Sequence, residues 1–371
     1  MTTRPRRDFI RDCALTAAAG ALLPRRTWGA QEQASLHEAL YWEKAAGGAT
    51  RCTLCPAACV RMPGTDGSCR ARGNRDGRLY SLVYGRPAVI SLDRIEKSPL
   101  YHFEIEGKAF SIATAGCNLH CRFCQNRQYS QEGPDAVKSY NLSPRDVIAR
   151  AKKHKVNTIN FFYTEPVVYY EYMIDIAQRA KEEGMKTVCV TAGYINPEPL
   201  LQLTELIDAF VFGLKGFDDT FYRTYIGCEL EPIKRALKIL SEKRDTTWVE
   251  VVNLLVPGLN DSDASVRTMC AWLAADIGVD VPLHFTRFEP YYELKKVPPT
   301  PVETIRKAHA AAGAAGLQYV YMGNIPGSEG ANTFCPKCGK AVVERVNFQV
   351  VKRHLKKGVC TCGFRLPGQW L

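Results

Sequence analysis

The chain has 371 residues, of which 46% are apolar and 23% charged, the ordinary composition of a globular protein. It contains no run of about 18 apolar residues, so no membrane-spanning helix is predicted. The net charge of +11 is spread along the chain without a compact basic and aromatic pattern, which argues against nucleic acid as a partner.

Residues 1–34 are predicted to be a targeting segment. The stretch Arg6-Arg7-Asp8-Phe9-Ile10-Arg11 is similar to a twin-arginine signal, and the weakly apolar stretch after it is too short to span a membrane. Such signals export proteins that have already folded around their cofactors, which predicts a periplasmic location. A cytoplasmic protein with a disordered basic tail is the alternative.

The cysteines are unusually numerous and unevenly spaced. Eleven of the fifteen fall in three groups with gaps of a few residues, which favours metal binding over a disulfide framework. The groups are Cys52, Cys55, Cys59 and Cys69; Cys117, Cys121 and Cys124; and Cys335, Cys338, Cys360 and Cys362. Cys189 lies outside them, in an apolar stretch, and is predicted to be a buried packing residue.

The central group follows the apolar run 109–114 with the spacing C-x3-C-x2-C. Three thiolates on one short loop can hold a [4Fe–4S] cluster and leave one iron without a protein ligand. An open coordination position is typical of a metal site that binds a reactant. A zinc knuckle is the alternative, but zinc sites usually use paired C-x2-C knuckles, so the three-residue gap argues against it.

The N-terminal region, residues 36–105, carries the first group. Gly64 and Gly67 stand between its ligands and allow the sharp turns that a four-cysteine site needs. Four thiolates suit either zinc or a second iron–sulfur cluster, and the spacing does not choose between them. The site is expected to be either an electron relay or a structural staple.

Residues 106–328 alternate short apolar runs with amphipathic stretches, the pattern of a parallel α/β barrel. Helix-start signals stand at Ser143-Pro144, Asn196-Pro197 and Thr300-Pro301. Helices are also expected over 172–183 and 232–243 from periodicity. The expected strands are 109–115, 157–164, 186–191, 208–214, 247–256, 281–286 and 317–322.

Polar residues recur where these strands end. Glu165 precedes Pro166, Thr191 ends the third strand and Lys215 ends the fourth, while His284 lies in the sixth. Active residues of parallel barrels gather at the carboxyl ends of the strands. We therefore expect these side chains to share one rim with the central cysteine loop.

Residues 331–371 form a tail that is similar to a zinc ribbon. Cys335-Pro336-Lys337-Cys338 and Cys360-Thr361-Cys362 flank a strand-like stretch, so the two cysteine pairs are expected on neighbouring turns. The second pair is C-x-C where C-x2-C is usual. Zinc is the expected metal.

Taken together, the motifs resemble the AmmeMemoRadiSam-system radical S-adenosylmethionine (SAM) enzymes, which are relatives of the pyruvate formate-lyase activating enzymes. The resemblance covers residues 36 to 371 and implies a partial TIM barrel of the (β/α)6 type. The stretches that carry it are Ala39-Leu40-Tyr41-Trp42, Cys52-Thr53-Leu54-Cys55-Pro56, Leu79 to Gly85, Ile95 to Phe103, Ser111 to Asn126, Tyr163 to Pro166, Leu214 to Phe217, Leu255 to Asp261 and Gly323 to Gly327.

The resemblance also implies roles for individual residues. Cys117, Cys121 and Cys124 would ligate the cluster, and Phe123 would contact the SAM adenine. The Glu165-Pro166 pair takes the place of the superfamily's Gly-Gly-Glu motif, which receives the SAM amino group. Further positions near SAM would be Thr191, which belongs to a Thr-Asn pair in the family, Lys215, which is preceded here by Gly213 instead of aspartate, and His284.

The predicted function is reductive cleavage of SAM to a 5′-deoxyadenosyl radical that abstracts hydrogen from a substrate. The resemblance implies a low-potential electron donor, and either a protein substrate or Memo-like and AMMECR-like partner proteins. Two other classes remain as alternatives: a multi-cluster electron-transfer or metal-binding protein without SAM chemistry, and a DNA-binding zinc protein that uses the tail. The first does not account for the polar rim of Glu165, Lys215 and His284, and the second predicts salt-dependent binding to nucleic acid.

Overall fold

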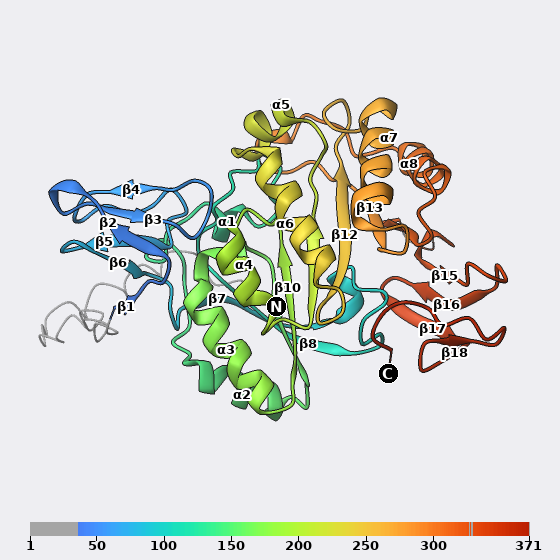
Figure 1. Cartoon of the computed structure of the whole chain (residues 1–371), viewed down its shortest axis with the longest axis horizontal. Coiled ribbons are helices and arrows are strands. Elements are labelled where there is room, and N and C mark those ends of the chain that lie inside the picture. Colours follow the sequence, from blue (N-terminus) through green and yellow to red (C-terminus); the bar gives the residue numbers. More distant parts are fainter. Residues whose placement is uncertain (1–35, 326, 328, 371) are drawn as a thin grey trace, which may run out of the picture. The chain divides into compact units, whose positions relative to one another are not determined.

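One eight-stranded sheet organises the chain in this computed structural model, which describes residues 36–325, 327 and 329–370 (Figure 1). Its spatial order is β14-β13-β12-β11-β10-β9-β8-β7. All neighbours from β8 to β14 run parallel, and β7 pairs antiparallel with β8. The strands are β7 (Pro87–Arg94), β8 (Lys108–Thr114), β9 (Thr158–Phe161), β10 (Lys186–Thr191), β11 (Ala209–Gly213), β12 (Trp248–Leu255), β13 (Leu283–Arg287) and β14 (Val320–Gly323).

Six crossover helices connect the parallel strands, as the βαβ alternation predicts. They are α2 (Pro144–Lys153), α3 (Tyr170–Glu182), α4 (Pro197–Thr204), α6 (Leu230–Glu242), α7 (Asp263–Trp272) and α8 (Val302–Ala314). Among the described residues, the edge strands β7 and β14 do not pair with each other. The predicted partial barrel is therefore confirmed, with six β/α units and a seventh parallel strand.

Local sequence signals explain some of the helix starts. Ser143 forms a full capping box with Asp146, and Pro144 occupies the first turn of α2 as expected. Thr300 does not cap α8, which begins at Val302; its hydroxyl donates to the Leu255 carbonyl (2.6 Å). Asn196 occupies the N-cap position of α4 as expected, but it makes no side-chain capping hydrogen bond, and its side-chain amide donates to the Thr53 carbonyl in the N-terminal region (2.7 Å). In both cases a tertiary contact takes the capping side chain.

Short segments complete the barrel. The short helices are α1 (Arg127–Ser130) and α5 (Asp219–Phe221), and π-helical turns follow at Tyr222–Ile226 and Leu273–Ile277. Single 3-10 turns lie at Ala46–Gly48, Ile95–Lys97, Pro166–Tyr169, Tyr292–Leu294 and Glu329–Ala331.

The core has an outer and an inner part. Buried side chains of the strands and helices form the large outer cluster. Inside the amino end of the barrel, Ile95, Leu100 and Phe103 pack against residues of β8, β10, β11 and β12. Because both faces are covered, strands such as β9 and β11 are buried at every residue. Cys189 on β10 is buried, which confirms its predicted packing role.

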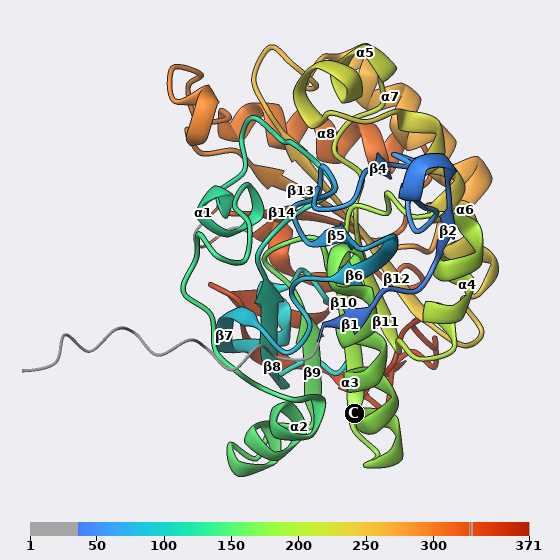
Figure 2. The ribbon, with the colours of Figure 1, turned by 90° about the vertical axis from the view of Figure 1, so that its left-hand side faces the viewer.

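Two small antiparallel sheets precede the barrel, in the orders β1-β6-β5 and β2-β3-β4 (Figure 2). The expected N-terminal region of 36–105 also includes β7, which belongs to the main sheet, and the 3-10 turn Ile95–Lys97, which packs inside the barrel. The small strands are β1 (His37–Glu38), β2 (Trp42–Lys44), β3 (Thr50–Cys52), β4 (Val60–Arg61), β5 (Arg72–Arg75) and β6 (Arg78–Ser81).

The tail consists of short hairpins. Its strands are β15 (Thr333–Phe334), β16 (Ala341–Val346), β17 (Gln349–Arg353), β18 (Leu355–Lys356) and β19 (Val359–Cys360). No helix of the described residues is long and apolar enough to cross a membrane. The predicted targeting segment, residues 1–34, lies outside the described residues.

Candidate active site and cysteine centres

The central cysteine loop leaves the carboxyl end of β8 and is fixed by backbone hydrogen bonds. The His120 amide donates to the Ile226 carbonyl (2.7 Å), and the Arg122 amide donates to the Tyr225 carbonyl (3.0 Å). The π-helical turn after α5 thus holds the loop in place. Cys117 is buried, Cys121 and Cys124 are half-buried, and all three thiols are free.

Burial keeps the Cys117 and Cys121 thiols protonated in the absence of metal. It raises the pKa of the Cys117 thiol well above its usual value and that of Cys121 to about 12, with the ammonium of Lys215 acting in the opposite direction on Cys121. The three sulfurs do not all lie within 4.8 Å of one another, unlike those of the tail group. The loop therefore fits a multi-iron group better than one tetrahedral ion, and iron binding would release the protons.

Glu165 is a buried carboxylate at the end of β9. One oxygen accepts hydrogen bonds from the Thr191 hydroxyl (2.5 Å) and the Val167 amide (3.4 Å), and the other accepts from the Ala192 amide (2.9 Å). Burial raises the pKa of Glu165, while these hydrogen bonds and the charge of Lys215 oppose the rise. The structure thus brings the predicted residues Glu165 and Thr191 into direct contact.

Lys215 follows β11 and its backbone is held on both sides. Its amide donates to the Tyr222 hydroxyl (2.9 Å), and its carbonyl accepts from the Asn260 side chain (2.6 Å). Its ammonium makes no hydrogen bond or ion pair with any described residue, although it lies close enough to Glu165 and Cys121 to affect their charges. The lysine is therefore a fixed and available cation beside the cysteine loop.

Gly213 explains how Lys215 reaches this position. A Cβ at Gly213 would lie 2.9 Å from the lysine Nζ and 3.3 Å from its Cε. The side chain of Lys215 therefore packs against Gly213. The family that the sequence resembles has an aspartate at the position of this glycine.

Phe123 is buried and stacks on Phe221, with the ring centroids 6.4 Å apart and the planes 18° apart. Its ring is thus part of the packing between the cysteine loop and α5.

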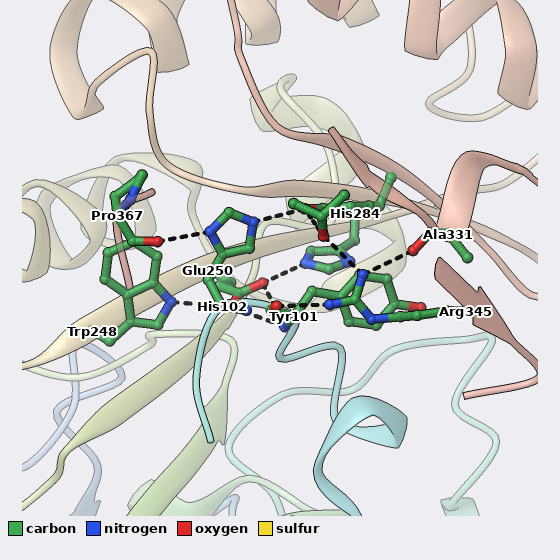
Figure 3. Close-up of polar contacts among 10 residues, drawn as sticks. Tyr101, His102, Trp248, Glu250, His284, Ala331, Arg345 and Pro367 are labelled. Carbon is green, nitrogen blue, oxygen red and sulfur yellow. Dashed lines mark hydrogen bonds and ion pairs between the residues drawn. The ribbon is translucent and has the colours of Figure 1, made fainter. Parts of the chain in front are cut away.

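His284 does not join the rim. It lies near the amino end of β13, where its Nε2 donates to Glu250 on β12 (2.7 Å) (Figure 3). Its ring also packs against Tyr101 and Tyr321. The described contacts of His284 are thus with Glu250, Tyr101 and Tyr321 and not with the predicted rim residues, and its expected contact with SAM stays a prediction.

Glu250 is the centre of that buried network and was not predicted from the sequence. Besides His284, it accepts hydrogen bonds from the Tyr101 amide (3.0 Å), the His102 amide (2.8 Å) and the Trp248 indole (3.0 Å). Burial alone would raise its pKa, but these donors and nearby histidines lower it overall. The tail joins the network, since Arg345 donates to the Tyr101 carbonyl (2.8 Å) (Figure 3).

The tail cysteines form a compact group. The Cys335 and Cys362 sulfurs are 3.6 Å apart, and those of Cys338 and Cys360 are 3.7 Å apart. All four lie within 4.8 Å of one another. Zinc–sulfur bonds of about 2.3 Å in a tetrahedron place sulfurs roughly 3.8 Å apart, so the group has the dimensions of one zinc ion despite the C-x-C spacing.

The first cysteine group is also assembled. Cys52, Cys55, Cys59 and Cys69 line one cavity, together with Arg72. Arg72 was not predicted from the sequence, because nothing in the local pattern indicates a buried arginine three residues after Cys69.

Comparison with known proteins agrees with this site. The profile of the Radical SAM superfamily matches residues 111–269, which include the cysteine loop, Glu165, Thr191 and Lys215. The uncharacterized protein MJ0808 of Methanocaldococcus jannaschii is 41% identical over 313 residues, covering 84% of this chain and 92% of that protein.

A more distant relative has a named activity. The pyruvate formate-lyase-activating enzyme of Clostridium pasteurianum is 27% identical over 160 residues, which are 42% of this chain and 64% of that enzyme. A crystal structure of a radical SAM methyltransferase from Sphaerobacter thermophilus superimposes with a TM-score of 0.46 at 17% identity, covering 58% of this chain and 66% of that one.

The chain belongs to the radical SAM superfamily of enzymes. Within it, the chain is related to the pyruvate formate-lyase activating enzymes, and it uses a [4Fe–4S] cluster and SAM. When bound, these cofactors supply a 5′-deoxyadenosyl radical through one-electron cleavage of SAM.

Proposed function

We propose that Cys117, Cys121 and Cys124 ligate the [4Fe–4S] cluster and that the neighbouring rim residues bind SAM. Glu165 and Thr191 would receive the SAM ammonium, since the Glu165 carboxylate keeps acceptor capacity beyond its present hydrogen bonds. Lys215 would pair with the SAM carboxylate. Phe123 would contact the adenine. Its buried ring also holds the cysteine loop against Phe221 of α5.

The observation that carries this proposal is the unpaired ammonium of Lys215 beside Cys121 and Glu165. A half-buried cation without an ion-pair partner in the described chain suits a ligand carboxylate. The cysteines, carboxylate and ammonium come from the carboxyl ends of β8, β9 and β11, where parallel barrels place their active residues.

We propose that the substrate is a protein and that the radical abstracts a hydrogen atom from it. Support comes from the names of relatives, which include activating enzymes of pyruvate formate-lyase, choline trimethylamine-lyase and isethionate sulfite-lyase. In this step a substrate C–H bond breaks, the 5′-deoxyadenosine C–H bond forms, and the radical passes to the protein. Memo-like and AMMECR-like proteins are the partners that the sequence motifs suggest, and a low-potential one-electron carrier would supply the electron.

The tail cysteines are proposed to hold structural zinc. Their mutual distances support one tetrahedral ion, and the backbone of Cys362 lowers the pKa of the Cys360 thiol to about 6, which favours a thiolate ligand. Export through the twin-arginine route remains a separate proposal that rests on residues 1–34 alone. Mass spectrometry of the N-terminus after cell fractionation tests it, and intact Met1–Gly29 found only in the cytoplasm contradicts it.

Anaerobic reconstitution with iron, sulfide, SAM and dithionite tests the enzymatic proposal. The expected product is 5′-deoxyadenosine, which disappears in the triple variant Cys117→Ala/Cys121→Ala/Cys124→Ala. Cys270→Ala is the matched control, because Cys270 is buried in α7 outside the three groups. Failure of the wild type to form 5′-deoxyadenosine while its central loop binds iron would favour an electron carrier without SAM chemistry.

A further inference from the structure

The four cysteines of the first group, Cys52, Cys55, Cys59 and Cys69, line one cavity. They lie at the end of β3, on the turn after it and just before β5. Their thiols share the cavity wall with the apolar side chains of Leu54, Leu79, Val167 and Val168. Arg61, Ser68, Arg72 and Asn118 complete the lining, so the cavity combines thiols and hydrocarbon with a few hydrogen-bonding groups.

The spacing of these thiols argues against a single metal ion. Among the described residues, only the tail group has three or more potential ligand atoms all within 4.8 Å of one another. No three of Cys52, Cys55, Cys59 and Cys69 meet that distance. Thiolates around a cluster stand farther apart than around one ion, because each binds a different iron or a different edge of the cluster. The tail group provides an internal comparison at the dimensions of zinc.

A buried cation faces the cavity. Arg72 is 2% exposed, and its guanidinium donates to the Cys52 sulfur (3.1 Å) and forms an ion pair with Glu171 (2.5 Å). It also donates to the Leu40 carbonyl. Four thiolates concentrate negative charge, which an adjacent guanidinium offsets, and hydrogen bonds to cysteine sulfur tune the reduction potential of a cluster.

The cavity adjoins the central cysteine loop. The Cys117 amide donates to the Cys69 carbonyl (3.1 Å), so one hydrogen bond joins a cysteine of each group. Gly116 permits this approach, because a Cβ there would lie 2.4 Å from the Cys69 oxygen and the residue has a φ of +91°. Asn118, from the central loop, lines the same cavity as Cys55, and its side-chain amide donates to the Tyr194 carbonyl (2.7 Å).

The first cysteine group lies within reach of solvent. Cys52, Cys55, Cys59 and Cys69 are all half-buried, as are Cys121 and Cys124 of the central loop, whereas Cys117 is buried. An external electron carrier can therefore approach the first cysteine group.

We propose that Cys52, Cys55, Cys59 and Cys69 hold a second iron–sulfur cluster that passes electrons to the cluster on the central loop. This extends the proposed function, since it assumes that the central loop carries the SAM-cleaving cluster. A low-potential one-electron carrier reduces the second cluster by one electron. That cluster is reoxidised as the central cluster is reduced, and the central cluster delivers the electron to SAM.

Metal analysis of the reconstituted triple variant Cys117→Ala/Cys121→Ala/Cys124→Ala tests the site without SAM chemistry. We expect this full-length variant to keep iron and acid-labile sulfide in equal amounts and to show the electron paramagnetic resonance signal of a reduced cluster. A second zinc per chain, in addition to that of the tail, with no sulfide overturns the proposal. The result does not depend on 5′-deoxyadenosine formation, so the two proposals can fail separately.

Two further variants test the electron-transfer role. Cys55→Ala/Cys69→Ala should keep the SAM-responsive signal of the central cluster but slow its reduction by a protein electron carrier at least tenfold. Unchanged reduction contradicts the relay. If that variant does not fold, Arg72→Gln serves instead: it removes the cation beside Cys52 and should move the reduction potential of the second cluster to more negative values. A purely structural arginine would leave the potential unchanged.

Discussion

Replacing Lys215 with methionine should weaken SAM binding while leaving the cluster in place. Methionine keeps the apolar stem of the side chain and removes the ammonium. The backbone anchors of the loop, Tyr222 and Asn260, contact only the main chain of residue 215, so they are unaffected by the change. The expected defect is therefore confined to the charge that pairs with the SAM carboxylate.

The magnitude follows from the setting of the ammonium. A charge-assisted hydrogen bond contributes about 1.5–3 kcal/mol, and an exposed ion pair roughly 1 kcal/mol or less. Lys215 is half-buried and has no competing ion pair in the described chain, so we expect the upper range. This corresponds to a rise of about 10- to 150-fold in the Kd for SAM. Titration of SAM into the anaerobically reconstituted enzyme, followed by the change in the cluster spectrum, measures it.

Gly213→Ala probes the same contact without removing the charge. Its Cβ would displace the ammonium from its place over the glycine, so SAM binding should weaken by a smaller factor. Lys238→Met is the matched control, because Lys238 forms an exposed ion pair with Asp276 on the outer helices. A Kd for SAM that changes less than threefold in Lys215→Met, with iron content unchanged, would refute the assigned role.

Three further predictions concern stability and metal content. Glu250→Gln should lower the free energy of unfolding by about 3–5 kcal/mol in urea titrations, because a buried carboxylate with four donor groups loses its charge. The control Glu231→Gln, at an exposed residue, should change the free energy of unfolding by less than about 1 kcal/mol. Similar losses in both variants would contradict the importance of the Glu250 network. Burial lowers the pKa of His102 in the folded protein to about 4, so the unfolded chain binds a proton at this residue more readily than the folded protein does. The free energy of unfolding should therefore fall as the pH drops from about 6.5 towards 4. His102→Asn should flatten the dependence over that range, and an unchanged slope counts against it. Cys360→Ser should cost the protein about one zinc per chain by metal analysis and expose the tail to limited proteolysis, whereas retention of all zinc would assign the metal elsewhere.

Much of the candidate site was predictable from the chain itself. The three-cysteine spacing limits the chemistry, because few groups bind thiolates at C-x3-C-x2-C. The alternation of apolar runs and helix signals predicts a parallel α/β barrel, and the polar residues after its strands predict Glu165, Thr191 and Lys215 near the loop. These inferences succeed because they depend on local periodicity and on the fixed direction of parallel strands.

His284 shows where that reasoning stops. A residue within a strand can face inward near either end of the barrel, and strand periodicity does not say which. Only the tertiary structure shows that His284 is hydrogen-bonded to Glu250 and that its ring packs against Tyr101. Thr300 and Asn196 make no side-chain capping hydrogen bond for the same reason, since their side chains donate to carbonyl groups that are distant in the sequence.

The sequence by itself determined that the chain carries three cysteine groups and an α/β barrel, because both are recognised from the spacing of residues that lie close together in the chain. The tertiary structure decided how the groups differ. Distances of 3.6 and 3.7 Å in the tail fit one ion, while a cavity with a buried arginine separates the thiols of the first group. Distances between ligands depend on how turns pack against the barrel, and that packing involves residues such as Arg72, Glu171 and Gly116 that no local pattern connects to the cysteines.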